Sequence, residues 1–201
     1  MAVRIDGKAL AAKVKDQVRE EAAQLPRRPG LAVILVGDDP ASQIYVRGKE
    51  KDCTECGIES FEHRLPAETA QEDLLALVRE LNADSAVDGI LVQLPLPGHL
   101  NGEQVINAIV PDKDVDCFHP FNVGRMSIGQ PAFLPCTPAG VMEMLRAYDV
   151  PVRGKRCVVL GRSNIVGKPM AMLLTQADGT VTVCHSKTEG LAEITRQADI
   201  L

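Results

Sequence analysis

Short apolar segments alternate with helical segments along this chain, and that alternation restricts the possible folds more than any other feature of the sequence. Strand-like apolar runs are expected near residues 31–36, 58–64 and 89–93. Helical patterns are expected at 8–25, 40–56, 70–82 and 102–109. Strands that alternate with helices predict a parallel sheet covered by helices, so the fold class is α/β.

Two domains are expected. Residues 1–148 form a three-layer α/β catalytic domain with a mainly parallel sheet; within it, 111–135 is expected to be a loop, and Thr137 and Pro138 begin a helix that ends near Tyr148. Residues 149–201 form an incomplete Rossmann-like dinucleotide-binding domain, because two strands and the start of a third are fewer than an independently stable sheet needs. The second domain is therefore expected to be truncated. Its predicted elements are strands at 156–160, 181–184 and 199–201 and helices at 167–176 and 191–196.

Composition and charge exclude several classes of protein. The 201 residues carry a formal net charge of -5, which argues against broad binding to nucleic acid or to anionic membranes. Charged residues interrupt the apolar N-terminus, and no segment has the roughly 20 apolar residues that span a bilayer. A cytoplasmic location with six reduced cysteines is expected. Cys53 and Cys56 form a single C-x-x-C, which does not favour a metal or redox site.

One expected helix carries an unusual row of polar side chains. Asp39 is its expected N-cap, Pro40 its first residue and Gly57 its end. At about 100° per residue, one face of this helix carries a hydroxyl, a phenol, an amine and two thiols. The alternative is that the amine, Lys49, is an ordinary exposed lysine. The residues on this face are Ser42, Tyr45, Lys49, Cys53 and Cys56.

A glycine-containing turn joins the strand at 156–160 to the helix at 167–176. Gly161 and Gly167 place backbone N–H groups at a helix N-terminus, where a pyrophosphate is stabilised, although an ordinary strand-to-helix turn would have the same elements. Arg162 follows the first glycine, and Ser186 and Lys187 follow the next strand. At that place an acidic residue favours NAD, whereas basic and hydroxyl groups accommodate a 2′-phosphate, so NADP is the preferred cofactor.

The segment 111–120 contains three aspartates at alternate positions, Asp112, Asp114 and Asp116. A calcium loop is excluded, because Cys117 stands at the sixth position where glycine is needed and Val123 at the twelfth where glutamate is needed. A ligand-binding aspartate and a solvated acidic loop both remain open. Separately, Gln93 lies at the carboxyl end of an expected strand, where ligands of parallel sheets bind.

Five motifs together resemble the bifunctional methylenetetrahydrofolate dehydrogenase/cyclohydrolase family of the bacterial FolD type. The resemblance covers essentially the whole sequence, in the family's order. The motifs are Y-V-R-G-K-E-K (45–51), D-G-I-L-V-Q-L-P-L-P (88–97), P-D-K-D-V-D-C-F-H-P-F-N-V-G-R (111–125), P-C-T-P-A-G (135–140) and G-R-S-N-I-V-G-K-P-M (161–170).

The resemblance implies NADP-dependent oxidation of methylenetetrahydrofolate to methenyltetrahydrofolate, followed by hydrolysis to formyltetrahydrofolate. It implies that Lys49 is catalytic, that Gln93 contacts it, that Tyr45 lines the folate site and that Asp116 holds the pterin. It also implies a homodimer through the cofactor domain. The NADP-binding residues would be Gly161, Arg162, Ser163 and Ser186.

The lysine suits the hydrolytic step. Water must add to a cationic carbon while protons move, and a desolvated lysine, unlike an arginine, can exchange a proton near neutral pH. One departure from the family is Cys117, which stands where the family usually has glycine. The alternatives are a truncated folate-binding module with little turnover and another NADP-linked α/β oxidoreductase.

Overall fold

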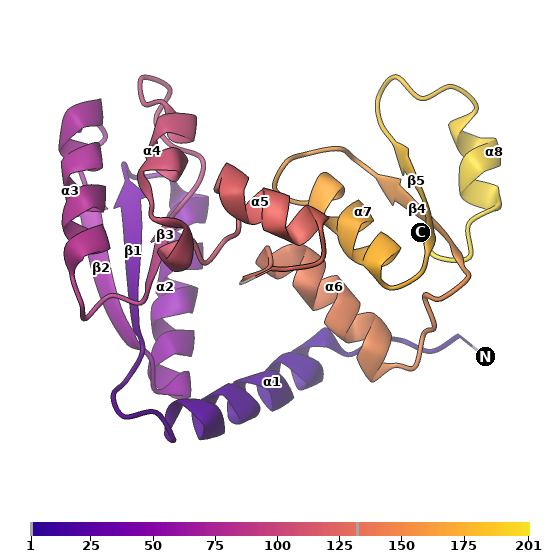
Figure 1. The fold of residues 1–201 in the computed structure, drawn as a ribbon, viewed down its shortest axis with the longest axis horizontal. Coiled ribbons are helices and arrows are strands. Elements are labelled where there is room, and N and C mark those ends of the chain that lie inside the picture. The colour runs from indigo at the N-terminus through magenta and orange to yellow at the C-terminus, as the bar shows by residue number, and fades with distance from the viewer. Residues whose placement is uncertain (1, 132) are drawn as a thin grey trace. The chain divides into compact units, whose positions relative to one another are not determined.

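The structure is a computed structural model that describes residues 2–131 and 133–201 (Figure 1). Contacts divide it into two compact units. One comprises residues 11–115; the other comprises residues 2–10 and the described residues from 116 onward. Each unit contains a parallel sheet, as the alternation of segments predicts.

The sheet of the first unit has three strands in the order β2-β1-β3, all parallel. The strands are β1 (Gly30–Val36), β2 (Glu59–Leu65) and β3 (Gly89–Val92). Helix α2 (Pro40–Cys56) connects β1 to β2, and α3 (Gln71–Ala83) connects β2 to β3. Helix α4 (Gly102–Ala108) follows β3. Because parallel strands all point the same way, their carboxyl ends meet at one edge of the sheet.

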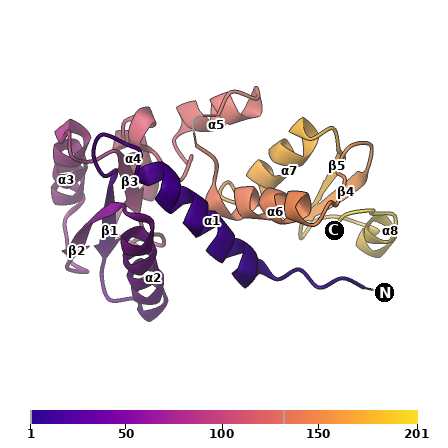
Figure 2. The same ribbon diagram turned by 90° about the horizontal axis from the view of Figure 1, so that it is seen from below.

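Strand β1 is the centre of a three-layer arrangement, since it is buried on both faces. Ala32, Ile34 and Val36 pack with α3 and α4 on one face. Val33 and Leu35 pack with Val46 of α2 on the other. Figure 2 shows α3 and α2 on opposite sides of this sheet. Burial on both faces explains why the sequence of β1 is continuously apolar rather than alternating.

Helix α1 (Gly7–Ala22) contacts the second half of α2 through ion pairs and a hydrogen bond. Lys15 Nζ lies 2.8 Å from Asp52 Oδ1 and 2.7 Å from Glu55 Oε2. Hydrogen bonds to these two carboxylates raise the pKa of Lys15. The thiol of Cys56 also donates to the carbonyl oxygen of Lys15. These contacts connect α1 to the helix that carries Lys49.

An ion pair joins the segments that precede β1 and β3. Both oxygens of Asp88 accept from the Arg27 guanidinium, at 2.6 and 2.7 Å, and Asp88 Oδ2 also accepts from the Gly30 N–H at 2.8 Å. The Arg27 hydrogen bonds, and then the Gly30 N–H, hold the pKa of Asp88 below its usual range. The carboxylate therefore favours the folded state only while it is ionised.

We expect Asp88→Asn to lower the free energy of unfolding at pH 7 by no more than about 1 kcal/mol, because both partners are about half exposed. The pKa of Asp88 is lowered in the folded state, so its contribution is complete above the unfolded value of about 3.9 and is lost as the pH falls through the folded value. Urea unfolding at pH 7 and pH 3 should show the difference shrinking at the lower pH. The exposed Asp38 gives a control, Asp38→Asn, that should change little.

The second unit contains a two-stranded parallel sheet of β4 (Arg156–Leu160) and β5 (Thr180–Cys184). Helix α7 (Gly167–Gln176) connects the two strands, and α6 (Cys136–Ala147) packs against α7. Helix α8 (Leu191–Arg196) follows β5. The expected third strand is a single parallel bridge, between Ile200 and Cys157.

Two predictions for residues 111–148 are wrong. The expected loop at 111–135 contains a 3-10 turn, η1 (Pro111–Lys113), and helix α5 (Pro120–Ser127). His119 caps α5, since its Nδ1 accepts from the Phe121 N–H at 3.1 Å, and histidine is not among the usual N-cap residues. Helix α6 begins at Cys136 after Pro135, so Thr137 lies inside the helix and is not its N-cap.

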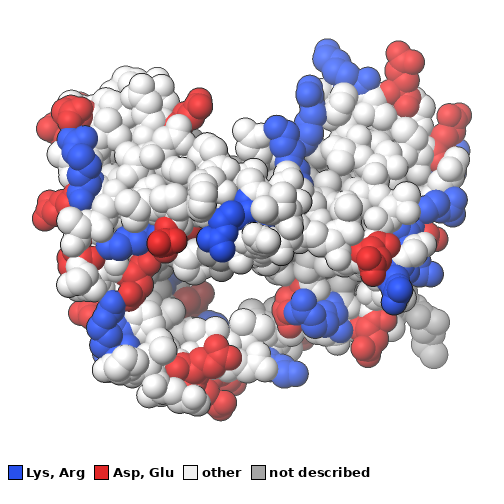
Figure 3. Space-filling model, viewed as in Figure 1, with Lys and Arg blue, Asp and Glu red and all other residues white. Residues whose placement is uncertain are grey.

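Acidic and basic side chains are interspersed over the face drawn in Figure 3. That distribution is in keeping with the modest net charge of -5. Among the residues that the structure describes, no helix has the length and apolarity required to cross a bilayer. All six cysteines are thiols, as expected from the sequence.

Candidate active site

The helix that carries the candidate lysine begins and ends as the sequence predicts. Asp39 Oδ2 accepts from the Ser42 N–H at 2.7 Å, and Pro40 is the first helical residue. This hydrogen bond lowers the pKa of Asp39, which keeps the cap ionised at the positive end of the helix. Gly57 ends the helix with a left-handed φ of 75°. These local signals fix the position of Lys49, ten residues after the N-cap Asp39.

Lys49 and Gln93 are in direct contact. Lys49 Nζ donates to Gln93 Oε1 at 2.9 Å, from α2 to the residue that follows β3. Gln93 Nε2 donates at 2.9 Å to the carbonyl oxygen of Leu94, and this second bond turns the amide oxygen toward the lysine. An amide that binds its own neighbour with one end and an amine with the other holds the amine at the carboxyl edge of the sheet.

The other side chains of the predicted face of α2 differ in exposure. Ser42, Cys53 and Cys56 are buried in the unit, and burial raises the pKa of the Cys53 thiol. Lys49 is half-buried, whereas Tyr45 is 66% exposed. The buried thiols thus belong to the core, and the face is open to a ligand at Tyr45 and Lys49.

The three aspartates at 112–116 have three different environments. Asp112 is exposed, Asp114 is 2% exposed and forms a parallel bridge with Ile90, and Asp116 is half-buried. The sequence did not distinguish the buried Asp114 from its neighbours. Asp116 belongs to the second contact unit, whereas Tyr45, Lys49 and Gln93 belong to the first.

Cys117 has a left-handed backbone, with φ of 57°, and its side chain is buried. This conformation is easy for glycine and strained for other residues, which gives the departure noted in the sequence a physical meaning.

We expect Cys117→Gly to be more stable than Cys117→Ala by about 1 kcal/mol or more, because both variants remove the sulfur and only alanine keeps the strain. Urea unfolding of the two variants measures the difference. The control compares glycine with alanine at position 140, which is helical and exposed. There the protein with alanine should be more stable than the protein with the natural Gly140. Equal stability of the two variants at 117 would contradict a strained backbone.

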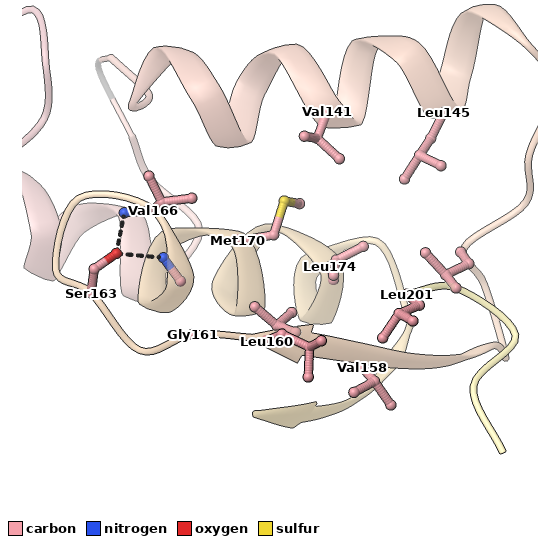
Figure 4. A pocket seen from close by; sticks show the side chains of 13 residues that line it. Val141, Leu145, Val158, Leu160, Gly161, Ser163, Val166, Met170, Leu174 and Leu201 are labelled. Atoms are coloured by element: carbon pink, nitrogen blue, oxygen red, sulfur yellow. Dashed lines mark hydrogen bonds between the residues drawn. The ribbon is translucent and has the colours of Figure 1, made fainter. Parts of the chain in front are cut away.

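The turn between β4 and α7 is closely packed around its two glycines. Gly161 has φ of 134°, and its N–H donates to the Cys184 carbonyl at 2.8 Å. A Cβ on Gly167 would lie 2.3 Å from the Gly161 carbonyl oxygen, so glycine is required there. Ser163 Oγ accepts from the N–H groups of Val166 and Gly167, both at 3.2 Å (Figure 4). The serine still has a hydroxyl proton to donate to a ligand.

Arg162 and Ser186 extend from the same edge of the second sheet. Leu160 of β4 pairs with Cys184 of β5, and each of the two polar residues lies two positions further on. Both side chains are exposed. The turn after β5 is closed by a hydrogen bond of 2.8 Å from the His185 N–H to Thr188 Oγ1. The two residues expected to bind a 2′-phosphate thus follow paired strand ends, and the residue at position 186 is a serine and not an acid.

A pocket of about 290 Å³ lies beneath this turn (Figure 4). Its walls are aliphatic side chains of α6, α7 and β4, and Gly161 and Ser163 form part of its lining. The sequence did not predict this pocket, because it depends on how the two helices pack over the strand. Its lining includes Val141, Leu145, Val158, Met170 and Leu174.

Fold and site together define a two-domain α/β protein. The first sheet has a lysine–glutamine pair at its carboxyl edge, and the second sheet has a dinucleotide-type turn after its strand β4. The model of the tetrahydrofolate dehydrogenase/cyclohydrolase catalytic domain matches residues 5–116, and that of the same family's NAD(P)-binding domain matches residues 135–201. The chain belongs to the tetrahydrofolate dehydrogenase/cyclohydrolase family.

Individual relatives agree with this assignment. The bifunctional protein FolD of Ruminiclostridium cellulolyticum is 58% identical over 200 residues, which is 98% of this chain and 70% of the relative. A crystal structure of the bifunctional enzyme FolD from Campylobacter jejuni has a TM-score of 0.95 at 52% identity and covers 97% of this chain and 71% of its own. The Trypanosoma brucei enzyme, solved with NADP and an inhibitor, has a TM-score of 0.94 at 45% identity. The match covers 98% of this chain and 70% of the Trypanosoma brucei chain.

Proposed function

We propose that the protein oxidises methylenetetrahydrofolate to methenyltetrahydrofolate with NADP and hydrolyses the product to formyltetrahydrofolate. The observation that carries this proposal is the 2.9 Å contact between Lys49 Nζ and Gln93 Oε1 at the carboxyl edge of the first sheet. Family membership supplies the reaction, since relatives that are 58% and 59% identical to this chain carry the name bifunctional protein FolD.

The two reactions make different demands on the side chains. In the oxidation, bound NADP supplies the chemistry by accepting a hydride, and the protein positions the two reactants. In the hydrolysis, water adds to the methenyl carbon and a proton must be taken up and returned. Lys49 is the group that we assign to this proton transfer. Gln93 orients it, because the glutamine oxygen accepts one of its N–H groups.

We assign substrate binding to Tyr45 and Asp116. The phenol is 66% exposed one helical turn before Lys49, which suits contact with a ring of the substrate. A carboxylate at position 116 suits the amino and ring N–H donors of a pterin.

We assign cofactor binding to the turn after β4 and to the residue that follows β5. The N-terminus of α7 and the close approach at Gly167 fit a pyrophosphate. Arg162 and Ser186 each lie two positions beyond paired strand ends. Basic and hydroxyl side chains there suit a 2′-phosphate and favour NADP over NAD. The residues of this proposed site are Gly161, Arg162, Ser163 and Ser186.

The proposed functional division places the folate-binding catalytic domain in residues 1–148 and the NADP-binding domain in residues 149–201. A cytoplasmic location and a lack of nucleic-acid partners are part of the same proposal, supported by the charge of -5. We also propose a homodimer formed through the second domain. Its support is a groove of about 470 Å³ along α7 and β5, lined by Met172, Val181 and Val183.

An absorbance assay tests the proposed reaction. Mixed with methylenetetrahydrofolate and NADP, the protein should form methenyltetrahydrofolate, seen as a new absorbance band, and then consume it; NAD should give a slower reaction. Folate binding without turnover would favour a folate-binding module instead. Failure to bind folate, with NADP still bound, would favour a different NADP-linked oxidoreductase.

A further inference from the structure

A pocket of about 390 Å³ lies at the amino edge of the first sheet, whereas the lysine–glutamine pair lies at the carboxyl edge. Its walls come from the end of α1, the segment that leads into β1 and the glycine that ends α2 (Figure 1). All of these residues belong to the compact unit of residues 11–115. The lining includes Arg19, Ala22, Leu25, Arg27, Arg28 and Gly57.

Every charged side chain that lines the pocket is basic. Among the residues that the structure describes, no aspartate or glutamate forms part of the lining. The whole chain has 27 acidic and 22 basic residues, so a wall with three arginines and no acid is contrary to its composition. Arginines near a helix end can bind the last carbonyl groups of the helix, and that role would explain the cluster without a ligand.

Arg27 is the fixed member of the three arginines. Its guanidinium donates to both oxygens of Asp88 and to the carbonyl oxygens of Ser85 and Arg28. Neither carbonyl belongs to the last turn of α1 or α2, so Arg27 does not cap these helices. Asp88 neutralises its charge, and the bond to the Arg28 carbonyl fixes the backbone from which the next arginine extends.

Arg19 and Arg28 remain available to a ligand. Within the described part of the chain, the Arg28 guanidinium has no hydrogen bond or ion pair, although the carbonyl oxygen of this residue accepts from Arg27. Arg19 pairs with Asp16 at 2.6 Å, and both side chains of that pair are more than half exposed. An exposed ion pair contributes little to stability, so an anion in the pocket can replace Asp16.

We propose that this pocket binds the phosphate group of a small phosphomonoester through Arg19 and Arg28. Guanidinium groups match phosphate oxygens, since each can donate two parallel hydrogen bonds. Leu25 is 52% exposed and offers apolar surface to the organic part of the ligand. A small ligand is favoured over a nucleic acid, because a long polyanion would meet a chain of net charge -5. The site uses none of the residues assigned to folate or NADP.

Titration with inorganic phosphate and with phenyl phosphate, followed by ¹⁵N–¹H NMR at constant ionic strength, tests the proposal. The backbone amides of Ala22 and Gly57 report on this pocket, whereas phosphate at the turn after β4 would shift those of Gly161 and Gly167. We expect both probes to shift the amides of the pocket. Phenyl phosphate should bind about threefold more tightly, because its ring would cover part of Leu25.

Arg28→Gln is expected to raise the Kd of both probes at least about tenfold, because it removes hydrogen bonds from a charged donor. The variant should fold normally, since Arg28 is exposed and its side chain has no ion pair to lose. The matched control is Arg79→Gln, which removes an exposed arginine that is paired with Glu72 on α3. That variant should leave both Kd values unchanged.

An unchanged Kd in Arg28→Gln would overturn the proposal, and so would amide shifts that sodium chloride alone reproduces. Equal affinities for the two probes would overturn the choice of a phosphomonoester, since the organic part would then make no contact with Leu25. None of these measurements involves turnover. The phosphate site can therefore fail while the proposed function stands, and the proposed function can fail while the site stands.

Discussion

Lys49→Met is expected to slow the hydrolysis of methenyltetrahydrofolate by about 10²–10⁴-fold, the usual contribution of a positioned acid or base. Methionine has a similar length and an apolar end, so it can occupy the same half-buried place on α2. It cannot donate to Gln93 Oε1 or exchange a proton. The loss should therefore be chemical and not structural, with the folate KM changing much less than kcat.

The decay of the methenyl absorbance band measures this rate directly when the enzyme is supplied with methenyltetrahydrofolate. Lys51→Met is the matched control, because Lys51 lies two residues away on the same helix and is exposed. Its loose ion pair with Glu55, at 3.7 Å, is expected to contribute little to stability. Near-normal hydrolysis by Lys49→Met would refute the assignment of the lysine.

Gly167→Ala is expected to abolish measurable NADP binding and to lower the free energy of unfolding by about 1–3 kcal/mol, the usual range for an overpacked site. The added Cβ would lie 2.3 Å from the carbonyl oxygen of Gly161, 2.5 Å from its carbonyl carbon and 2.8 Å from the Arg162 nitrogen. All three are backbone atoms and cannot rotate away. The turn must open, which removes both the Ser163 caps and the arrangement of N–H groups at the start of α7.

Isothermal titration with NADP and urea unfolding test the two parts of this prediction. Gly140→Ala is the control in the same unit, because no described atom outside its own helix backbone and chain neighbours lies within 4 Å of the new methyl group. That variant should bind NADP normally and gain up to about 1 kcal/mol from helix propensity. Normal NADP binding by Gly167→Ala would show that the turn is not the cofactor site.

Local signals made some elements predictable from the sequence. Asp39, Pro40 and Gly57 each act within a few residues of the helix end that they define, so the bounds of α2 could be predicted closely. Strand β4 and helix α7 were likewise predicted with their observed bounds, because an apolar run, a glycine turn and a proline follow one another. Parallel pairing followed from the alternation of strands and helices.

Features that depend on tertiary contacts could not be predicted. His119 caps α5 with a ring nitrogen, which no usual capping rule includes. The burial of Asp114, and not of Asp112, comes from its bridge to Ile90 on a distant strand. The resemblance implied that Gln93 contacts Lys49, but it did not show that the Leu94 carbonyl selects which end of the amide faces the amine.

That selection has a consequence for the direction of the lysine's lone pair. A carbonyl-type oxygen can only accept, so one N–H of Lys49 stays directed at Gln93 whether the amine is charged or neutral. When the amine loses a proton, the lone pair must then occupy one of the remaining tetrahedral positions, which point away from the glutamine. The amide thus fixes the direction of one N–H of the amine, and the lone pair that can take a proton from water does not point at the glutamine oxygen.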